Sequence, residues 1–298
     1  MSTETVDLSY EPFSREPEYI EVNRHFIESL NLTPYQCILD LACGTGTVTV
    51  LICDYTQPML DARREAGIKT NGTIIGVDLS QESLAHAQAY LLTHGFLHRR
   101  HVRLARASAD SLPLPDCSFD VVIVGNAIQL FEDKERVVSE VNRVLRPGGL
   151  FAFNTSFYVG TYVPGTEGVY VSWVEEAVRY LMRKDEDSKR LGLPRVRRKK
   201  GVDSQPAFSR PWLSLNEYEQ LIERHGFEVQ NRFERIVKLN RSNLETIGSF
   251  AGLASVLLKG YPIRLACEGL ERSAGPALAA AGLDAVPRRW LELVARKK

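Results

Sequence analysis

The sequence lacks the features that mark secreted, disulfide-linked and membrane-spanning proteins. Its five cysteines lie far apart and form no CxxC pair, a pattern that favours reduced thiols over a disulfide framework. The N-terminal 20 residues contain prolines and acidic residues but no apolar core of a signal peptide. No apolar run approaches the ~18 residues needed to cross a bilayer. These absences predict a cytoplasmic protein with no membrane span.

A net charge is absent as well, because 37 basic residues balance 37 acidic ones. A neutral chain produces no overall field that attracts nucleic acid or anionic lipid. The basic run RVRRKK at residues 195–200 has no interleaved aromatic residues on which bases could stack, so we expect a solvated loop there. The composition therefore favours a small-molecule substrate and no nucleic-acid partner.

Strand-like and helix-like segments alternate from residue 37 to residue 154. The predicted strands are 37–42, 73–80, 101–110, 118–127 and 150–154, and the predicted helices are 17–31, 80–92 and one that begins at Lys134 and ends at Pro147. The apolar run DVVIV in the fourth strand is typical of a strand covered on both faces. This alternation predicts a parallel, doubly wound sheet with helices on both faces.

The regular alternation lapses after residue 155. The later prediction is a helix over 171–193, a helix and then a strand over 213–240, apolar helices over 241–287 and a last strand over 288–298. We predict an N-terminal lid at 1–31 and a main domain at 32–298, with inserted cap segments at about 155–210 and 241–287. The apolar second cap must be buried on the body of the protein or, in a homo-oligomer, against another copy of the chain.

The turn that follows the first strand carries two glycines, in the stretch ILDLACGTGTVTV at residues 38–50. In open α/β sheets, ligands bind beyond the carboxyl ends of the strands. Gly44 and Gly46 allow the backbone to bend tightly and to approach such a ligand. A dinucleotide-binding fingerprint would place a third glycine where this sequence has Thr49. The turn therefore argues against a bound pyrophosphate.

Three aspartates follow three successive predicted strands: Asp40, Asp78 and Asp110. On a parallel sheet they would line one edge, where one can pair with an ammonium, one can accept from ribose hydroxyls and one can accept from an adenine amino group. S-adenosylmethionine has these three groups and no phosphate. A nicotinamide oxidoreductase on a similar sheet is the alternative, and both Thr49 and Asp110 count against it.

The motifs of this region also resemble those of a known family. They are ILDLACGTG, GVDLSQESLAHA, ASADSLPLPDCSFDVVIVGNAIQLFED and EVNRVLRPGG, which together cover roughly residues 37–154. In this order and spacing they resemble class I S-adenosylmethionine-dependent methyltransferases, of the branch that includes the menaquinone and ubiquinone C-methyltransferases. The resemblance implies a Rossmann-like, mostly parallel seven-stranded sheet with helical lid insertions. It implies S-adenosylmethionine as cofactor and no metal.

The resemblance also implies a set of cofactor-binding residues at the strand ends. They are Asp40, Ala42, Gly44, Gly46, Asp78, Leu79, Ala109, Asp110, Asn126 and Ala127. Within this set, Asp78 would hold the ribose diol, Asp110 would contact the adenine, and Asn126 would lie by the sulfonium. Gln129 occupies a place where relatives often carry histidine.

The spacing departs from the usual pattern between the glycine turn and the second strand. Asp78 follows Gly46 by 32 residues (78 − 46), whereas an acidic residue usually follows such a turn by about 20. The excess is DYTQPMLDARREAGIKTN at residues 54–71, which we interpret as a lengthened helix or an extra loop.

The acceptor and the base are less constrained by the sequence. We predict methyl transfer to a small lipophilic metabolite, by C- or O-methylation of an isoprenoid, aromatic or polyketide-like acceptor; the alternatives are an RNA methyltransferase and a non-catalytic S-adenosylmethionine-binding protein. The candidate bases are His25, Tyr19 and Tyr158, with Tyr10 and Glu167 behind them. Among the aromatic residues after the fifth strand, some should be core and others should line an acceptor pocket: Phe157, Tyr158, Tyr162, Tyr170 and Trp173.

Two further groups of residues have a structural interpretation. Cys43 is expected to be a packed side chain, because nothing nearby in sequence marks it as a thiolate. His94, His98 and His101 lie close together, but no cysteine or carboxylate completes a metal-ligand set, and a solvated loop is the expected structure.

Overall fold

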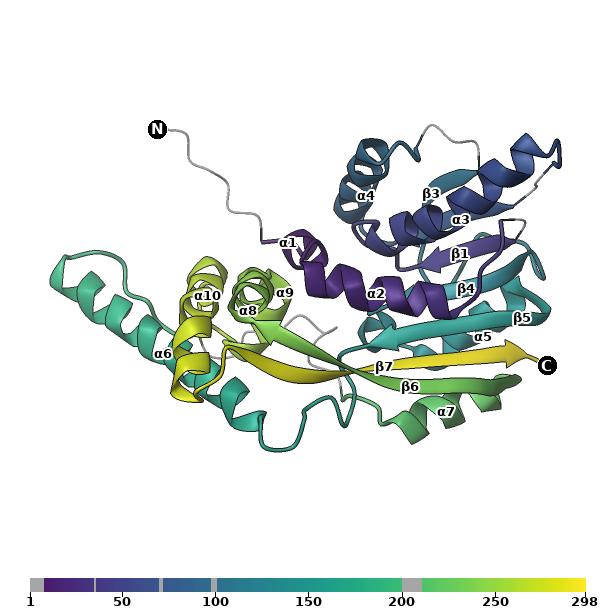
Figure 1. Ribbon diagram of the computed structural model, residues 1–298. Coiled ribbons are helices and arrows are strands. Elements are labelled where there is room, and N and C mark those ends of the chain that lie inside the picture. The colour runs from purple at the N-terminus through teal and green to yellow at the C-terminus, as the bar shows by residue number, and fades with distance from the viewer. Residues whose placement is uncertain (1–7, 35, 70–71, 98–100, 200–210) are drawn as a thin grey trace. The chain divides into compact units, whose positions relative to one another are not determined.

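The computed structural model describes residues 8–34, 36–69, 72–97, 101–199 and 211–298. These residues form a seven-stranded sheet with the strand order β3-β2-β1-β4-β5-β7-β6 (Figure 1). The strands are β1 Cys37–Leu41, β2 Thr73–Asp78, β3 Val102–Arg106, β4 Phe119–Gly125, β5 Leu145–Thr155, β6 Phe227–Asn240 and β7 Ala285–Lys297. Strands β1 to β5 pair in parallel, whereas β5 pairs with β7 in antiparallel orientation. The predicted fold class is confirmed.

The helices begin close to the residues that the sequence predicts. They are α1 Glu11–Ser14, α2 Pro17–Ser29, α3 Thr47–Glu65, α4 Gln81–Thr93, α5 Lys134–Val144, α6 Glu167–Arg190, α7 Leu215–Arg224, α8 Arg241–Ser249, α9 Ala251–Leu257 and α10 Ile263–Ala280, with a short 3₁₀ helix at Ile128–Leu130. At the start of α4 the Ser80 side chain accepts a hydrogen bond from the Ser83 amide at 3.1 Å. The start of α5 is capped in the same way by Asp133. Such caps satisfy amides that have no partner within the helix.

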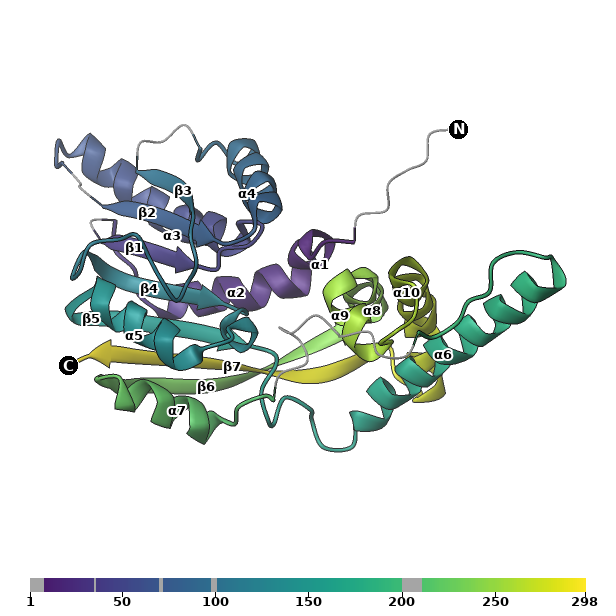
Figure 2. The same cartoon turned by 180° about the vertical axis from the view of Figure 1, so that it is seen from behind.

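Helices cover both faces of the sheet at its centre. The side chains of Val121 and Ile123 on β4 belong to a core that includes residues of α2, α3 and α4, which Figure 1 shows in front of the sheet. Val122 and Val124 face a second core, with residues of α5 and α7, which are best seen from behind (Figure 2). These four residues are all 0% exposed, so the run DVVIV is covered on both faces as predicted.

Several boundaries differ from the prediction: β3 ends at Arg106 and not at residue 110, and α6 begins at Glu167 and not at residue 171. Helix α5 ends at Val144, before Pro147, and the Lys297 ammonium donates to the carbonyl oxygens of Asn142 and Leu145 at this helix end. Strand β5 therefore begins at Leu145 and includes the Arg-Pro-Gly-Gly turn as an irregular stretch. Likewise α10 ends at Ala280 and β7 begins at Ala285, so the helical prediction over 241–287 is wrong for the residues after Ala280.

The residues in excess after the glycine turn form part of a helix. Helix α3 runs without a break from Thr47 to Glu65 and contains Pro58 in its interior. The lengthened-helix interpretation of residues 54–71 therefore holds for residues 54–65; residues 66–69 follow the helix as a turn and coil, and residues 70–71 lie outside the described residues. Its last turn carries Arg63 and Arg64, which suit the negative end of the helix dipole.

The chain divides into two compact units. The described residues within Tyr19–Thr161, Trp212–Arg235 and Trp290–Lys298 form the sheet unit, and those within Met1–Glu18, Tyr162–Pro211 and Ile236–Arg289 form the helical unit. In the helical unit α6 and α8 both pack on α10. The Trp173 indole N–H of α6 donates to the Leu270 carbonyl of α10 at 2.7 Å. The predicted division into a lid at 1–31 and a domain at 32–298 stays a prediction.

Among the described residues, no helix is both long enough and apolar enough to cross a membrane.

Candidate functional site

The candidate site lies at the carboxyl end of β1, where the strand order reverses. The chain runs outward from β1 to β2 and β3 and then returns to β4 on the other side of β1. Open α/β sheets bind their ligands at this position. All four strands and the turns that follow them belong to the sheet unit.

The glycine turn between β1 and α3 contains left-handed backbone at Ala42, Gly44 and Gly46, with φ angles of 59°, 53° and 86°. A Cβ added at Gly44 would meet no atom within 4 Å, so the turn is open there. A Cβ added at Gly46 would lie 3.0 Å from the Cα and Cβ atoms of Ala87 in α4. Gly44 therefore leaves room for a ligand, whereas Gly46 is required by the packing of α3 on α4.

Asp40 lies in β1 and is completely buried. Its Oδ2 accepts a hydrogen bond from the Thr49 hydroxyl at 2.5 Å, and its Oδ1 has no partner among the described residues. Burial raises the pKa of Asp40 to about 7, and the Asp78 carboxylate adds to the rise while the Thr49 hydrogen bond opposes it. The site thus contains a buried carboxyl with one free acceptor, which a ligand ammonium would satisfy.

Asp78 ends β2 and joins two turns. Its Oδ2 accepts from the Gly44 amide and its Oδ1 from the Ser80 amide, both at 2.8 Å. Each carboxylate oxygen can accept a second hydrogen bond, so both retain capacity toward a diol. Leu79, the next residue, is 62% exposed.

Asp110 lies in the loop between β3 and β4, which is attached to the end of β2. The Ala107 amide donates to the Asp78 carbonyl at 3.1 Å. The Ser108 hydroxyl donates to Asp110 Oδ1 at 2.6 Å, and Ala109 packs at the edge of the core. Asp40 and Asp78 therefore lie at the carboxyl ends of the neighbouring strands β1 and β2, and Asp110 lies in the loop after β3. Asp40 is buried, and the other two are partly exposed.

Asn126 joins the ends of β4 and β5. It has left-handed backbone with φ 48°, and its Oδ1 accepts from the amide and the hydroxyl of Ser156 at 2.8 and 3.1 Å. Its own amide donates to Asn154 Oδ1 at 2.8 Å. Asn126 and the adjacent Ala127 are both buried. The Asn126 side chain thus fixes the β4 turn, and its contact with the cofactor stays a prediction.

Gln129 is held inside the same network. Its side-chain amide donates to the Asn126 carbonyl and its Oε1 accepts from the Thr155 hydroxyl, both at 2.8 Å. Asn154 continues the network by donating to Asn23 Oδ1 on α2 at 2.9 Å. Asn154, Thr155 and Asn23 were not predicted as site residues. The polar run that directly follows the apolar LFAF was a signal for Asn154 and Thr155 but not for Asn23.

The three candidate bases occupy different environments. The Tyr158 hydroxyl is buried and donates to Glu234 Oε1 at 2.6 Å. Tyr19 is 5% exposed and its ring lies 5.9 Å from that of Trp290. His25 is on the exposed side of α2, where its Nε2 lies 2.9 Å from Glu21. Their catalytic role stays a prediction, as it does for Tyr10 and Glu167.

Strand β7 contributes buried polar groups that the sequence analysis missed. The Trp290 indole nitrogen is buried and has no hydrogen-bond partner among the described residues. Glu292 is 5% exposed, burial raises its pKa, and it pairs with the Arg235 guanidinium at 2.9 Å. The alternation in RRWLELV, which puts positions 288, 290 and 292 on one face of a strand, was the available signal.

The predicted aromatic set is divided between the two units. Tyr158 in the sheet unit and Trp173 in the helical unit are buried core residues. Phe157 packs edge-on against Trp212. In the helical unit, the rings of Tyr162 and Tyr170 lie 4.8 Å apart, and the Arg288 guanidinium lies 5.2 and 5.5 Å from their centres. The assignment of these rings to an acceptor pocket stays a prediction.

Cys43 is a packed side chain, and His94 is exposed to solvent. Cys43 is buried, and burial raises the pKa of its thiol well above the usual value, with Asp40 and Asp78 adding to the rise. His94 Nδ1 lies 2.9 Å from the Tyr90 carbonyl oxygen, and His98 lies outside the described residues. In the part of the chain that is described, no three His, Cys, Asp or Glu residues gather as metal ligands.

Comparisons with known proteins agree with this arrangement. Residues 39–153 match the family described as a methyltransferase domain. The chain is 34% identical to the demethylmenaquinone methyltransferase of Symbiobacterium thermophilum over 129 residues, which cover 43% of this chain and 46% of the relative. It is 31% identical to the ubiquinone/menaquinone biosynthesis C-methyltransferase UbiE of Hahella chejuensis over 112 residues, or 38% and 39% of the two chains. The match thus spans less than half of these relatives.

A solved structure extends the likeness to the whole fold. The YcgJ protein from Bacillus subtilis aligns with a TM-score of 0.53 and 17% identity, and the alignment covers 93% of this chain and 99% of that one. This likeness concerns the fold alone. Together with the sequence matches, it confirms the predicted resemblance: residues 39–153 are similar to a methyltransferase domain, and the fold is similar to that of the solved structure.

Proposed function

We propose that this protein transfers the methyl group of S-adenosylmethionine to a small lipophilic acceptor. One observation carries the proposal: the completely buried Asp40 carboxyl, with Oδ1 unpartnered among the described residues, lies in the strand that leads into the open turn at Gly44. A buried polar atom without a partner is costly unless a ligand satisfies it. The ammonium of the cofactor is a group of the right charge.

The other residues at this edge match the remaining parts of the cofactor. Asp78 would hold the ribose hydroxyls with the acceptor capacity that its two backbone hydrogen bonds leave. Asp110 would accept from the adenine amino group, with Leu79 and Ala109 against the apolar faces of the base. Asn126 and Ala127 would lie by the methionine end.

The bound cofactor supplies a methyl group that its sulfonium makes reactive. The task of the chain is to align an acceptor with that group and to exclude water. If the acceptor is a carbon or a hydroxyl, a base must also remove a proton, and His25, Tyr19 and Tyr158 remain the candidates.

The proposal of a lipophilic acceptor has two supports. The relatives named above are methyltransferases of menaquinone and ubiquinone biosynthesis, which are lipophilic molecules. The match to the methyltransferase family covers residues 39–153, so all three segments of the helical unit lie outside it. We infer that the helical unit carries the residues that select the acceptor, and that the protein acts in the cytoplasm on a free metabolite.

Transfer of a tritiated methyl group into a fractionated metabolite extract tests this function. We expect label in a fraction that an organic solvent extracts, and mass spectrometry of that fraction identifies the acceptor. Label in RNA and none in small molecules would favour an RNA methyltransferase. Binding of S-adenosylhomocysteine without any transfer would favour a non-catalytic binding protein, and binding of NAD in its place would contradict both.

A further inference from the structure

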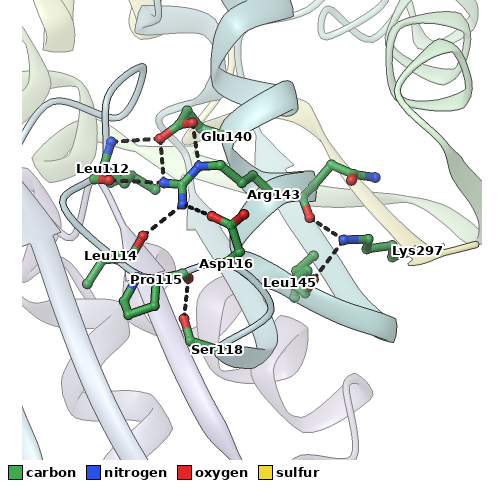
Figure 3. Close-up of polar contacts among 10 residues, drawn as sticks. Leu112, Leu114, Pro115, Asp116, Ser118, Glu140, Arg143, Leu145 and Lys297 are labelled. Atoms are coloured by element: carbon green, nitrogen blue, oxygen red, sulfur yellow. Dashed lines mark hydrogen bonds and ion pairs between the residues drawn. The ribbon is translucent and has the colours of Figure 1, made fainter.

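The loop at residues 107–118, which carries Ala109 and Asp110, is attached to helix α5 by two charged residues. The motif EVNR places Glu140 and Arg143 three residues apart, hence on the same side of α5. Figure 3 shows both side chains directed at the loop between β3 and β4. None of the functions discussed above requires these two residues to contact a ligand.

All five N–H groups of the Arg143 guanidinium have an acceptor. Its Nε donates to Glu140 Oε1 at 2.8 Å and its Nη2 to Glu140 Oε2 at 2.9 Å. The remaining three reach the loop: Nη2 donates to the Leu112 carbonyl at 3.0 Å, and Nη1 donates to the Leu114 carbonyl at 2.8 Å and to Asp116 Oδ1 at 2.6 Å. A lysine ammonium has three donors and no planar fork, so it cannot reproduce this set.

Glu140 holds the same part of the loop from the other side. Its Oε2 accepts a hydrogen bond from the Leu112 amide at 2.8 Å, so the carbonyl and the amide of Leu112 are both bound to α5. The hydrogen bonds from Arg143 are the main reason that the pKa of Glu140 lies below its usual value. The pKa of Arg143 is raised in turn. Both groups therefore stay charged at any pH near neutrality.

A third contact reaches Asp110 itself. Arg136, in the first turn of α5, donates from Nε to the Asp110 carbonyl at 2.9 Å. The Asp110 side chain accepts from Ser108 within the loop. Helix α5 thus holds the backbone of Asp110 through Arg136, and the loop that follows it, from residue 112 onward, through Glu140 and Arg143.

We propose that Glu140 and Arg143 are positioning residues for recognition of the nucleoside base: they fix the 107–118 loop so that Asp110 accepts from the 6-amino group of adenine. The proposal rests on the proposed function. Its consequence is selectivity, because an acceptor held rigidly beside a 6-amino group rejects a base that presents a 6-oxo group instead.

Calorimetry with S-adenosylhomocysteine and S-inosylhomocysteine tests the proposal, because the second ligand has a 6-oxo acceptor in place of the 6-amino donor and an N–H donor in place of the N1 acceptor. The comparison between variants, rather than the wild-type preference alone, therefore isolates the contribution of Asp110. We expect the wild-type protein to prefer the adenosyl ligand by about tenfold to a hundredfold, the usual value of a hydrogen bond to a charged group. In Arg143→Lys and in Glu140→Gln the preference should fall to about threefold. The preference of Asp110→Asn should be equally low, and adding Arg143→Lys to it should change nothing further.

A matched control is Arg146→Lys. Arg146 also pairs with a carboxylate, that of Asp120, but this pair lies at the opposite end of β4 from the site, so the base preference should stay at its wild-type value. If Arg143→Lys lowers the thermal stability and weakens both ligands equally, the residue is merely structural and the proposal is wrong. If the wild-type protein binds neither ligand, the proposed function itself fails. Glu140→Gln, which keeps the side-chain volume, provides the test if Arg143→Lys does not fold.

Discussion

Asp40 of the sheet unit and Arg288 of the helical unit are both ionisable side chains removed from water, at 0% and 7% exposure. Burial disfavours the charged form of Asp40 and raises its pKa to about 7. Arginine cannot lose its proton in a protein, so Arg288 stays cationic and lies against the faces of Tyr162 and Tyr170. The buried ionisable group of the sheet unit is thus a carboxyl whose ionisation is disfavoured, whereas that of the helical unit is a guanidinium cation.

The two units also differ in the interactions that determine their structures. In the sheet unit, turns, caps and carboxylates at strand ends set the site, and the family match lies in this unit. In the helical unit, close packing of α6 and α8 on α10 sets the structure. We infer that polar changes in the sheet unit act mainly on cofactor binding. Changes in the helical unit should act on stability and on the acceptor.

The largest effect is expected for Asp78→Ala. Two hydrogen bonds from ribose hydroxyls to a carboxylate contribute about 2 kcal/mol each, so the affinity for S-adenosylhomocysteine should fall about a thousandfold. The variant also loses the hydrogen bonds from the Gly44 and Ser80 amides, so its melting temperature should fall, but only by a few degrees. Glu82→Ala, which removes an exposed carboxylate from the first turn of α4, is the control and should bind normally. An unchanged affinity in Asp78→Ala would mean that the carboxylate at the end of β2 does not bind the ribose hydroxyls.

Gly46→Ala should destabilise the sheet unit by about 3 kcal/mol. The substitution puts a Cβ on left-handed backbone and against Ala87 at 3.0 Å, which adds strain to overpacking. Gly44→Ala has similar backbone strain but no atom within 4 Å of the new Cβ, so it should cost about 1 kcal/mol. Denaturant unfolding of both variants measures the difference. Equal losses would show that the contact with α4 is irrelevant.

Asp40→Asn should stabilise the protein in the absence of ligand, and more so at higher pH. The native pKa of Asp40 is about 7 against an ordinary value of 3.8, so the native state binds the proton more tightly and the wild-type stability falls as the pH rises from about 4 to 7. The variant lacks this titration. Its advantage should therefore be larger at pH 8 than at pH 5, by on the order of 2 kcal/mol.

The same substitution should weaken the binding of S-adenosylhomocysteine, because the ammonium loses its counter-ion. In the wild-type protein that ammonium should lower the pKa of Asp40, so binding below pH 7 should release a proton. Calorimetry at pH 6 in buffers of different ionisation enthalpy measures this release. A variant with no proton release and lower affinity, yet higher stability, would show that Asp40 is kept for binding at the expense of the fold.

The strands and their carboxylates were predictable because each signal is local. An apolar run that ends in Asp40 or Asp78 identifies both a strand and its last polar residue. The ionisation of Asp40 was not predictable in this way, because it depends on how completely distant segments bury it. The contacts of Arg143 with Leu112, Leu114 and Asp116 span 27 to 31 residues, and no local pattern in EVNR indicates them.

The smallest effect is expected for Gly269→Ala in the helical unit, and its sign should be opposite to that of Gly46→Ala. Gly269 lies inside α10, where alanine is favoured over glycine by up to about 1 kcal/mol. An added Cβ would lie 3.4–3.6 Å from Ala177, Tyr180 and Leu181 of α6, which is ordinary contact for most of these atoms. We therefore expect about 0.5 kcal/mol of stabilisation in denaturant unfolding, with unchanged affinity for S-adenosylhomocysteine. A loss of stability would mean that α6 packs too closely on α10 to accept the added Cβ. Packing in the helical unit would then tolerate an added methyl group as poorly as the glycine turn of the sheet unit does.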